Sequence, residues 1–260
     1  MLFLAAPLLA VPAQAAVPLP RPKPPRAGIT TIAAPVAVPI PRAKPGSVTK
    51  PGIVRAKPWP IKFGSWPVSE VREARAHCMA LLATRNLIWR PDNPIGEPGG
   101  CGTPAPIAVA EISGVRINPP ATINCDFAAA LGGWIDGTVQ PLARKALRLQ
   151  VTEIRNASAY ACRRRNNVSR GKLSEHAKAN ALDIASFRFA DGSEVTVKGQ
   201  ASGLLQAIGF SRRGDFIKGV RKEACPYFNT VLGPGSDPFH KDHMHLDLMQ
   251  LRPGRFKMCR

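Results

Sequence analysis

Proline recurs every few residues from about Ala16 to Pro60, in a segment that begins AVPLPRPKPPRAGITTIAAPVAVPIPRAKPG. Because proline fixes φ and has no backbone N–H, a chain this rich in proline cannot supply the interior of helices or sheets. We therefore expect residues 16–65 to form an extended, unpacked linker. The folded domain is expected to begin near Trp66, which confines it to residues 66–260.

The linker is also basic. No Asp or Glu occurs before Glu70, whereas nine Lys and Arg residues lie between Arg21 and Lys62. The whole chain of 260 residues has a formal net charge of +19. Such an excess favours anionic surroundings, which include nucleic acid, anionic lipid and acidic cell-wall polymer, and charge alone does not choose among them. The linker is interpreted as a spacer, with a basic tether to an anionic wall or membrane surface as the alternative.

The first residues, MLFLAAPLLAVPAQA, have the outline of a secretory signal. A short apolar run ends in small residues, and Ala13, Gln14 and Ala15 form an A-x-A cleavage site, although no Lys or Arg precedes the run. We expect residues 1–15 to be a signal peptide and the protein to be exported to the periplasm. No later stretch of about 20 apolar residues predicts a transmembrane helix.

The chain has six cysteines and no C-x-x-C pair, which argues against a thiolate zinc site. In an exported chain an even set of cysteines predicts three disulfides. Of the fifteen pairings that six cysteines permit, proximity in the sequence favours Cys225 with Cys259 and Cys78 with Cys101. The six cysteines are Cys78, Cys101, Cys125, Cys162, Cys225 and Cys259.

The pattern of apolar residues predicts an α+β domain. SEVREARAHCMALLAT (69–84) has helical spacing with Ser69 as its cap, and a second helix is expected from about Cys125 to Ala146 with Asn124 as its cap. LRLQVTEI, NALDIASFRF and HMHLDLMQL alternate like strands, short β runs follow EPGGCGTP, and ASGLLQAIG and DFIKGVRKEA have helical character. Because strands and helices do not alternate regularly, we expect a small antiparallel sheet with flanking helices.

Two segments contain residues that suit a metal site. SEHAKANALDI (174–184) places His176 and Asp183 at the two ends of a turn, and HKDHMHLDL (240–248) holds three of the five histidines. His243 and His245 lie two apart in a predicted strand, so they project from one face. One imidazole can then bind a metal while the other acts as a base. Taken singly, each pattern is equally consistent with a hydrogen-bonded turn or with packing, as we expect for His77.

The two segments together resemble zinc peptidases. SEHAKANALD (174–183) is similar to the S-x-H-x-x-G-x-A-x-D segment of the family that includes D-Ala-D-Ala carboxypeptidases and dipeptidases. HKDHMH (240–245) is similar to the H-x-x-H-x-H segment of penicillin-insensitive murein endopeptidases. Residues from about 70 to 260 resemble the bacterial extensin-like C-terminal family, with SAYACRRRN (158–166) and VLGPGSDPFHKDHMHLDL (231–248) as further support. The resemblance implies a disulfide-stapled domain with the fold of these peptidases.

The resemblance also implies roles for individual residues. One zinc ion per chain would be held by His176, Asp183 and His245. His243 would be the general base and His240 would lie beside the ligands or on the substrate side. Where the carboxypeptidase branch has a glutamate base, this chain has the shorter Asp242.

On the substrate side, the resemblance implies that Arg163 binds substrate or stabilises the oxyanion, with Arg164 close by. Ser174 would form a hydrogen bond near the ligand loop. Ala179 stands where relatives often carry glycine, a departure that leaves both ligands of the turn in place.

These expectations combine into a periplasmic zinc metallopeptidase that cuts peptide cross-links of peptidoglycan during cell-wall remodelling. A D-alanine carboxypeptidase is the alternative with the same chemistry. A peptidoglycan-binding module without turnover is the alternative from another class. A nucleic-acid binder is disfavoured, because basic and aromatic residues do not interleave and the chain begins with an export signal. The sequence makes no prediction of oligomeric state.

Overall fold

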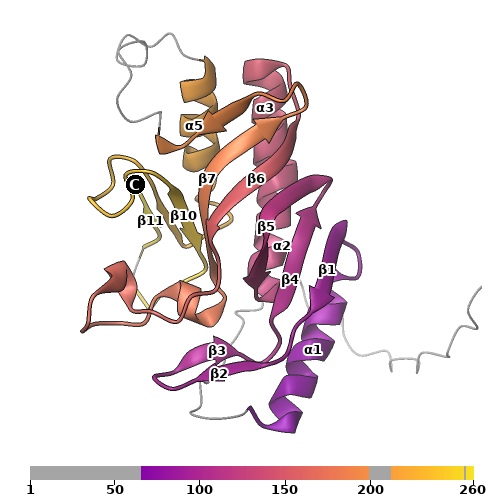
Figure 1. Ribbon diagram of the computed structural model, residues 1–260, viewed down its shortest axis with the longest axis vertical. Helices are drawn as coiled ribbons and strands as arrows, with labels where there is room; N and C mark the ends of the chain where they lie inside the picture. The colour runs from indigo at the N-terminus through magenta and orange to yellow at the C-terminus, as the bar shows by residue number, and fades with distance from the viewer. Residues whose placement is uncertain (1–65, 199–211, 255) are drawn as a thin grey trace, which may run out of the picture. The chain divides into compact units, whose positions relative to one another are not determined.

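The computed structural model describes residues 66–198, 212–254 and 256–260 (Figure 1). Every described residue belongs to one compact unit within Arg55–Arg260. The expected signal peptide, the proline-rich linker and the ASGLLQAIG helix lie outside the described residues. Within the described part, no helix is both long enough and apolar enough to cross a membrane.

A nine-stranded sheet forms the centre of the described domain, in the order β1-β4-β5-β6-β7-β10-β9-β11, with β8 paired to β7 (Figure 1). Its pairs are antiparallel except β5 with β6 and β9 with β11. This confirms the α+β class, but the sheet is larger than expected because the short strands before the second helix join it. The strands are β1 Leu87–Pro91, β4 Ile107–Ile112, β5 Val115–Ile123, β6 Val151–Ser158, β7 Ala181–Phe189, β8 Glu194–Thr196, β9 Thr230–Leu232, β10 Met244–Asp247 and β11 Met258–Cys259. A separate hairpin pairs β2, Ile95–Glu97, with β3, Cys101–Thr103.

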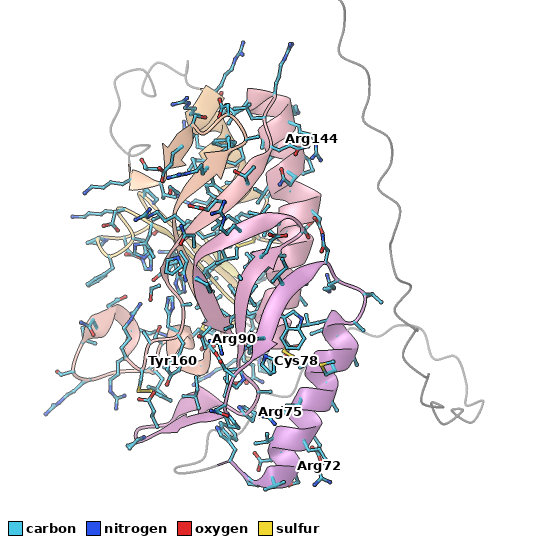
Figure 2. The ribbon with its side chains drawn as sticks, turned by 45° about the vertical axis from the view of Figure 1, so that its right-hand side comes forward. Arg72, Arg75, Cys78, Arg90, Arg144 and Tyr160 are labelled. Atoms are coloured by element: carbon cyan, nitrogen blue, oxygen red, sulfur yellow. A yellow bond between two sulfur atoms is a disulfide. The ribbon has the colours of Figure 1, made fainter. Side chains whose placement is uncertain are left out.

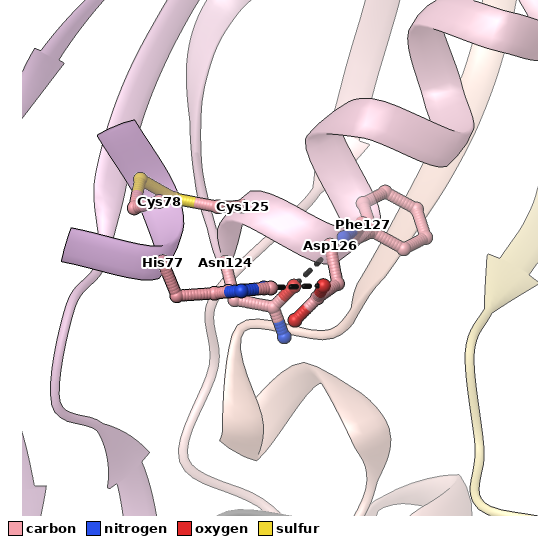
Figure 3. Close-up of a disulfide and its surroundings, with 6 residues drawn as sticks. All are labelled: His77, Cys78, Asn124, Cys125, Asp126 and Phe127. Atoms are coloured by element: carbon pink, nitrogen blue, oxygen red, sulfur yellow. Dashed lines mark hydrogen bonds and ion pairs between the residues drawn. A yellow bond between two sulfur atoms is a disulfide. The ribbon is translucent and has the colours of Figure 1, made fainter. Parts of the chain in front are cut away.

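The first helix, α1, spans Val68–Leu82. The expectation that Ser69 caps it is wrong, because the helix begins one residue earlier and the Val71 N–H donates to the Pro67 carbonyl at 3.1 Å. Asn124 does cap the second helix: its Oδ1 accepts from the Phe127 N–H at 2.8 Å (Figure 3).

The second helical run is continuous from Cys125 to Leu147, close to the expected limits. It consists of α2, Cys125–Trp134, a π-helical turn η1, Ile135–Val139, and α3, Gln140–Leu147. Because α3 continues to Leu147, β6 begins only at Val151, later than the LRLQVTEI alternation indicated. The helix expected in DFIKGVRKEA is α5, Arg212–Lys222.

Helices cover one face of β7. Phe187 packs against Trp134 of α2 and Phe216 of α5, with ring centroids 6.3 and 5.3 Å apart. Phe189 meets the same Phe216 at 5.4 Å. Figure 1 shows α2 and α3 behind the strands of the sheet. The apolar core therefore lies between the helices and this face, and the opposite face of β7 is left for polar residues.

A bulge in β7 keeps the core and polar faces apart. Arg155 pairs with Ser186 and the next residue of β6, Asn156, pairs with Ile184, so Ala185 is an extra residue in β7. Such a bulge shifts the in-out alternation by one residue. The core side chains before it, Leu182 and Ile184, therefore share a face with Phe187 and Phe189 after it. Asp183 points to the other face.

All six cysteines form disulfides, as expected. The predicted Cys225–Cys259 bond is confirmed. The predicted Cys78–Cys101 bond is wrong, because α1 packs against the start of α2 and brings Cys78 to Cys125, with Cα atoms 5.3 Å apart (Figure 3). Cys101 in β3 instead bonds to Cys162, which follows β6. Proximity in the sequence could not show which elements pack together.

Candidate metal centre

Two of the predicted ligands face each other across neighbouring strands. Asp183 in β7 and His245 in β10 are direct partners in the antiparallel register. Side chains directly opposite each other in such a pair project from the same face. His245 Nδ1 lies 2.8 Å from Asp183 Oδ1.

The third predicted ligand, His176, comes from the 3-10 turn η3, Glu175–Lys178, that precedes β7. Ser174 caps this turn, where its Oγ accepts from the His176 N–H at 3.4 Å. Ala179 ends the turn in the left-handed region with φ of 53°, a conformation that glycine adopts most readily. The turn brings His176 Nε2 to 3.1 Å from both Asp183 Oδ1 and His245 Nδ1.

In each of the two histidines, the ring nitrogen that points away from the cluster (the outer nitrogen) forms a hydrogen bond with another group. His176 Nδ1 lies 2.6 Å from the carbonyl oxygen of Ala159, and His245 Nε2 lies 3.0 Å from Asp247 Oδ2. Both partners accept hydrogen bonds, so both outer nitrogens donate, and in the neutral imidazoles the inner nitrogens present lone pairs. Two lone pairs and a carboxylate oxygen therefore converge in a buried place. This arrangement is stable only with a cation or an added proton between them.

The spacing fits a metal ion. In a tetrahedral zinc site with bonds of about 2.05 Å, ligand atoms lie about 3.3 Å apart. The three converging atoms here are 2.8 to 3.1 Å apart, so shifts of a few tenths of an ångström would give that geometry. The residues Asp183, His176 and His245 are also 5%, 0% and 8% exposed. The buried His176–Asp183–His245 cluster can therefore hold a metal ion.

The pKa shifts of Asp183 and His245 show that the cluster favours a positive charge between its side chains. Burial opposes ionisation of Asp183, but hydrogen bonds with His176 and His245 outweigh it and hold the pKa of this carboxyl far below its usual range. Burial would lower the pKa of His245, whereas Asp183 and Asp247 together raise the pKa to about 9. A proton on His245 thus takes the place of a metal in the metal-free chain.

The cluster opens into a pocket of about 260 Å³, which is lined by every predicted catalytic residue, that is Arg163, His240 and His243, and by Ser174. His243 immediately precedes β10. Its Nε2 is 3.6 Å from Asp183 Oδ1, and its Nδ1 is 2.9 Å from Asp242 Oδ1. The Asp242 side chain is 60% exposed. Asp242 therefore orients His243 from the solvent side, and the Nε2 of His243 points towards the cluster.

His240 is held in a similar way. Its Nδ1 lies 2.7 Å from Asp237 Oδ1, and its ring centroid is 5.2 Å from that of His243. Burial lowers the pKa of His240; Asp237 opposes this effect, and the charges of His243 and His245 add to it. His240 therefore presents a neutral ring to the pocket at neutral pH.

The arginines of the run 163–165 separate into two groups. Arg163 Nη2 is 3.7 Å from Asp183 Oδ2. Arg164 is not among the pocket residues, since its guanidinium donates to the Gly171 carbonyl in an exposed loop. The Arg164 backbone is extended, with φ of −79° and ψ of 162°, so its neighbours point the opposite way. Arg165, which the sequence analysis did not single out, therefore joins Arg163 in lining the pocket.

Asp247 was also missed. It lies two residues after His245 on the same strand, so the period of two that grouped His243 with His245 could have found it.

The segment that carries Arg163 is fixed to the β2–β3 hairpin at two points. Tyr160, labelled in Figure 2, donates to Glu97 Oε1 at 2.5 Å, and Cys162 bonds to Cys101. Burial and the adjacent Glu97 raise the pKa of Tyr160. These ties hold the arginine side of the pocket against the domain.

Comparison with curated proteins and with solved structures gives no match for this chain. The family described as Extensin-like protein C-terminus matches residues 76–260, well over half of the chain and all of the residues of the metal centre. The chain belongs to this extensin-like C-terminal family.

Proposed function

We propose that the protein is a zinc-dependent peptidase of the periplasm that hydrolyses peptide cross-links of peptidoglycan. The observation that carries the proposal is the buried His176–Asp183–His245 cluster at the bottom of an open pocket. Three protein ligands beside an open position are characteristic of catalytic zinc rather than structural zinc. Nitrogen and carboxylate donors without thiolates suit this borderline metal.

When bound, zinc polarises a carbonyl group and lowers the pKa of a water molecule to about 7. The chain's own residues provide the rest. His243 donates its Nδ1–H to Asp242, so its Nε2 can accept the proton of the attacking water and pass it to the leaving amine. Arg163 lines the pocket beside Asp183 and can stabilise the negative charge that develops on the carbonyl oxygen.

His240 supports a substrate-side role. Its neutral ring faces the pocket beside His243, and Asp237 fixes its tautomer with Nδ1 as the donor. Its Nε2 is then an acceptor for a peptide N–H of the substrate.

The substrate class follows from the surroundings that the chain suits. Three disulfides favour an oxidising compartment, in agreement with the export signal. Exposed arginines such as Arg72 and Arg75 of α1, Arg90 of β1 and Arg144 of α3 extend from several elements (Figure 2). A basic surface favours a polyanionic wall polymer as the surrounding material.

The test combines metal content with cleavage. The purified full-length chain is analysed for metal by mass spectrometry and incubated with cross-linked muropeptide dimers. We expect one zinc per chain and conversion of dimers to monomers. His176→Ala should lose both zinc and cleavage, whereas His243→Ala should keep zinc and lose cleavage.

His77→Ala is the matched control for removal of a histidine. His77 bonds to Asp126 beside the Cys78–Cys125 disulfide, away from the pocket (Figure 3), so this variant should retain both properties. Zinc without cleavage of any muropeptide would replace the peptidase with a wall-binding module. Absence of zinc from the wild type would refute the metal centre.

A further inference from the structure

Arg165 stands out among the three arginines of the run 163–165 because it is partly buried in the pocket without an anionic partner in the described part of the chain. Arg163 faces Asp183, and Arg164 donates to the Gly171 carbonyl. The Arg165 guanidinium donates through Nη2 to the sulfur of Met249 at 2.8 Å. Within the described ranges no carboxylate forms an ion pair with it.

A thioether is a poor partner for this group. Sulfur is a weak acceptor, whereas a guanidinium has five N–H donors and a full charge. Arg165 is partly buried even though its neighbours Arg164 and Asn166 are exposed. Removing a charged group from water without an anionic partner costs free energy. The partial burial of Arg165 therefore does not stabilise the fold, which points to a role in binding.

The backbone holds Arg165 in this position. Its N–H donates to the Lys172 carbonyl at 3.1 Å. The next two residues, Asn166 and Asn167, both have left-handed backbones, with φ of 55° and 54°. Asparagine adopts this conformation more readily than most residues other than glycine, and left-handed residues concentrate at ligand-binding sites. Both asparagines line the same pocket as the metal centre.

We propose that Arg165 binds a free carboxylate of the substrate and thereby makes the enzyme specific for peptides that carry one close to the cleaved bond. The inference rests on the proposed peptidase function and assigns a specificity residue to it. A guanidinium matches a carboxylate with two parallel hydrogen bonds. Arg163 is paired with Asp183 beside the reacting group, so Arg165 is the arginine available for this second contact.

The experiment compares two forms of one cross-linked muropeptide, one with its carboxylates free and one with them converted to neutral amides. KM and kcat are measured for the zinc-loaded full-length chain, for Arg165→Met and for Arg165→Lys. Arg170→Met removes the same charge from an exposed position of the same loop outside the pocket and serves as the control. Affinity is measured in parallel by calorimetry on His243→Ala, with and without Arg165→Met, so that binding is read without turnover.

For the free-carboxylate form, Arg165→Met should raise KM and the dissociation constant by about 10- to 100-fold, the usual effect of losing a charge-assisted hydrogen bond. kcat should change by less than about twofold, because the contact is the same in ground and transition states. Arg165→Lys should recover part of the affinity. The amide form should bind weakly to the wild type, and Arg165→Met should weaken it no further.

Equal effects of Arg165→Met on both forms, or no difference from Arg170→Met, would overturn this inference while the peptidase function stands. A fall in kcat at unchanged KM would overturn it as well. If the wild type neither binds nor cuts either form, the proposed function fails and the inference falls with it. Thermal unfolding of each variant identifies any loss of affinity that comes from misfolding.

Discussion

Replacing Asp247 with asparagine should weaken zinc binding without removing a ligand. Asp247 Oδ2 accepts from His245 Nε2 at 3.0 Å, and its Oδ1 accepts from the Met249 N–H at 2.8 Å. Both Asp247 and His245 are buried, at 5% and 8% exposure. The carboxylate therefore decides which nitrogen of His245 carries the hydrogen.

Asparagine at position 247 cannot accept hydrogen bonds from both His245 Nε2 and the Met249 N–H with two oxygens, as the carboxylate does. If its oxygen accepts from the Met249 N–H, its amide N–H groups face His245 Nε2. His245 must then move its hydrogen to Nδ1, the atom that would bind the metal. The change thus removes a charge-assisted hydrogen bond, worth about 1.5–3 kcal/mol, or imposes the wrong tautomer. Substitution of such outer partners usually lowers metal affinity by about 10- to 100-fold, or about 1.4–2.7 kcal/mol.

The assay is a competition titration of zinc against a coloured chelator, followed by hydrolysis of cross-linked muropeptides at saturating zinc. Asp242→Asn is the matched control, because it makes the same chemical change at the exposed carboxylate that orients His243. Asp242→Asn should keep the zinc affinity within about twofold and lower turnover, since it acts on His243, the proposed general base. An unchanged zinc affinity in Asp247→Asn, or equal losses in both variants, would refute the reasoning.

Three further predictions concern protons and stability. Zinc binding at pH 7 should release about one proton, because His245 has a pKa of about 9 in the metal-free chain and must be neutral to bind zinc. Calorimetry in buffers of different ionisation enthalpy measures this release, and finding none would contradict the prediction. The pKa of His245 in the folded chain lies above the usual 6.5, so its proton stabilises the folded metal-free chain, and the full contribution is present below about pH 6.5. Denaturant unfolding should show that this contribution to the free energy of unfolding is lost as the pH rises through 9. Replacing Cys101 and Cys162 by serine opens a bond across a separation of 61 residues and should lower the free energy of unfolding by about 4 kcal/mol; a loss below about 1 kcal/mol would mean that the unfolded chain is already compact there.

The candidate metal centre could be predicted from sequence because its residues follow two local rules. His245 and Asp247 obey the period of two of a strand, and His176 and Asp183 flank one short turn. Asp247 was overlooked although the same period of two reaches it from His245. The pairing of Asp183 with His245, by contrast, joins segments 62 residues apart, and only the resemblance connected them.

Other features needed the three-dimensional structure. The run of three consecutive arginines at 163–165 contains no alternation of apolar and polar residues to reveal which side faces the pocket, so Arg164 was chosen and Arg165 was not. The disulfide of Cys78 depends on the packing of α1 against α2, and sequence distance carries no information on it. Ser69 has good capping chemistry, but Pro67 and Val68 start the helix before it.

The bulge at Ala185 is the feature that lets one strand serve both the core and the metal centre. Before it, Leu182 and Ile184 face the helices, and after it Phe187 and Phe189 do. Deleting Ala185 would restore strict alternation with the four core side chains on one face and Asp183 on the other. With Ala185 present but no bulge, the same alternation would put either the two phenylalanines or Asp183 on the wrong face. Removing a buried phenylalanine side chain typically costs about 3–5 kcal/mol, so two displaced rings would consume most of the roughly 5–15 kcal/mol that stabilises a domain.

The chain lacking Ala185 should therefore fold with a regular β7, keep both faces in place and still bind one zinc ion. Ala185→Gly keeps the extra residue and should cost about 1 kcal/mol or less. Thermal unfolding and zinc content of the two variants distinguish the role of the bulge from that of the methyl group. A deletion variant that does not fold, or that folds without zinc, would show that β7 cannot become regular here and that the two faces depend on the bulge itself.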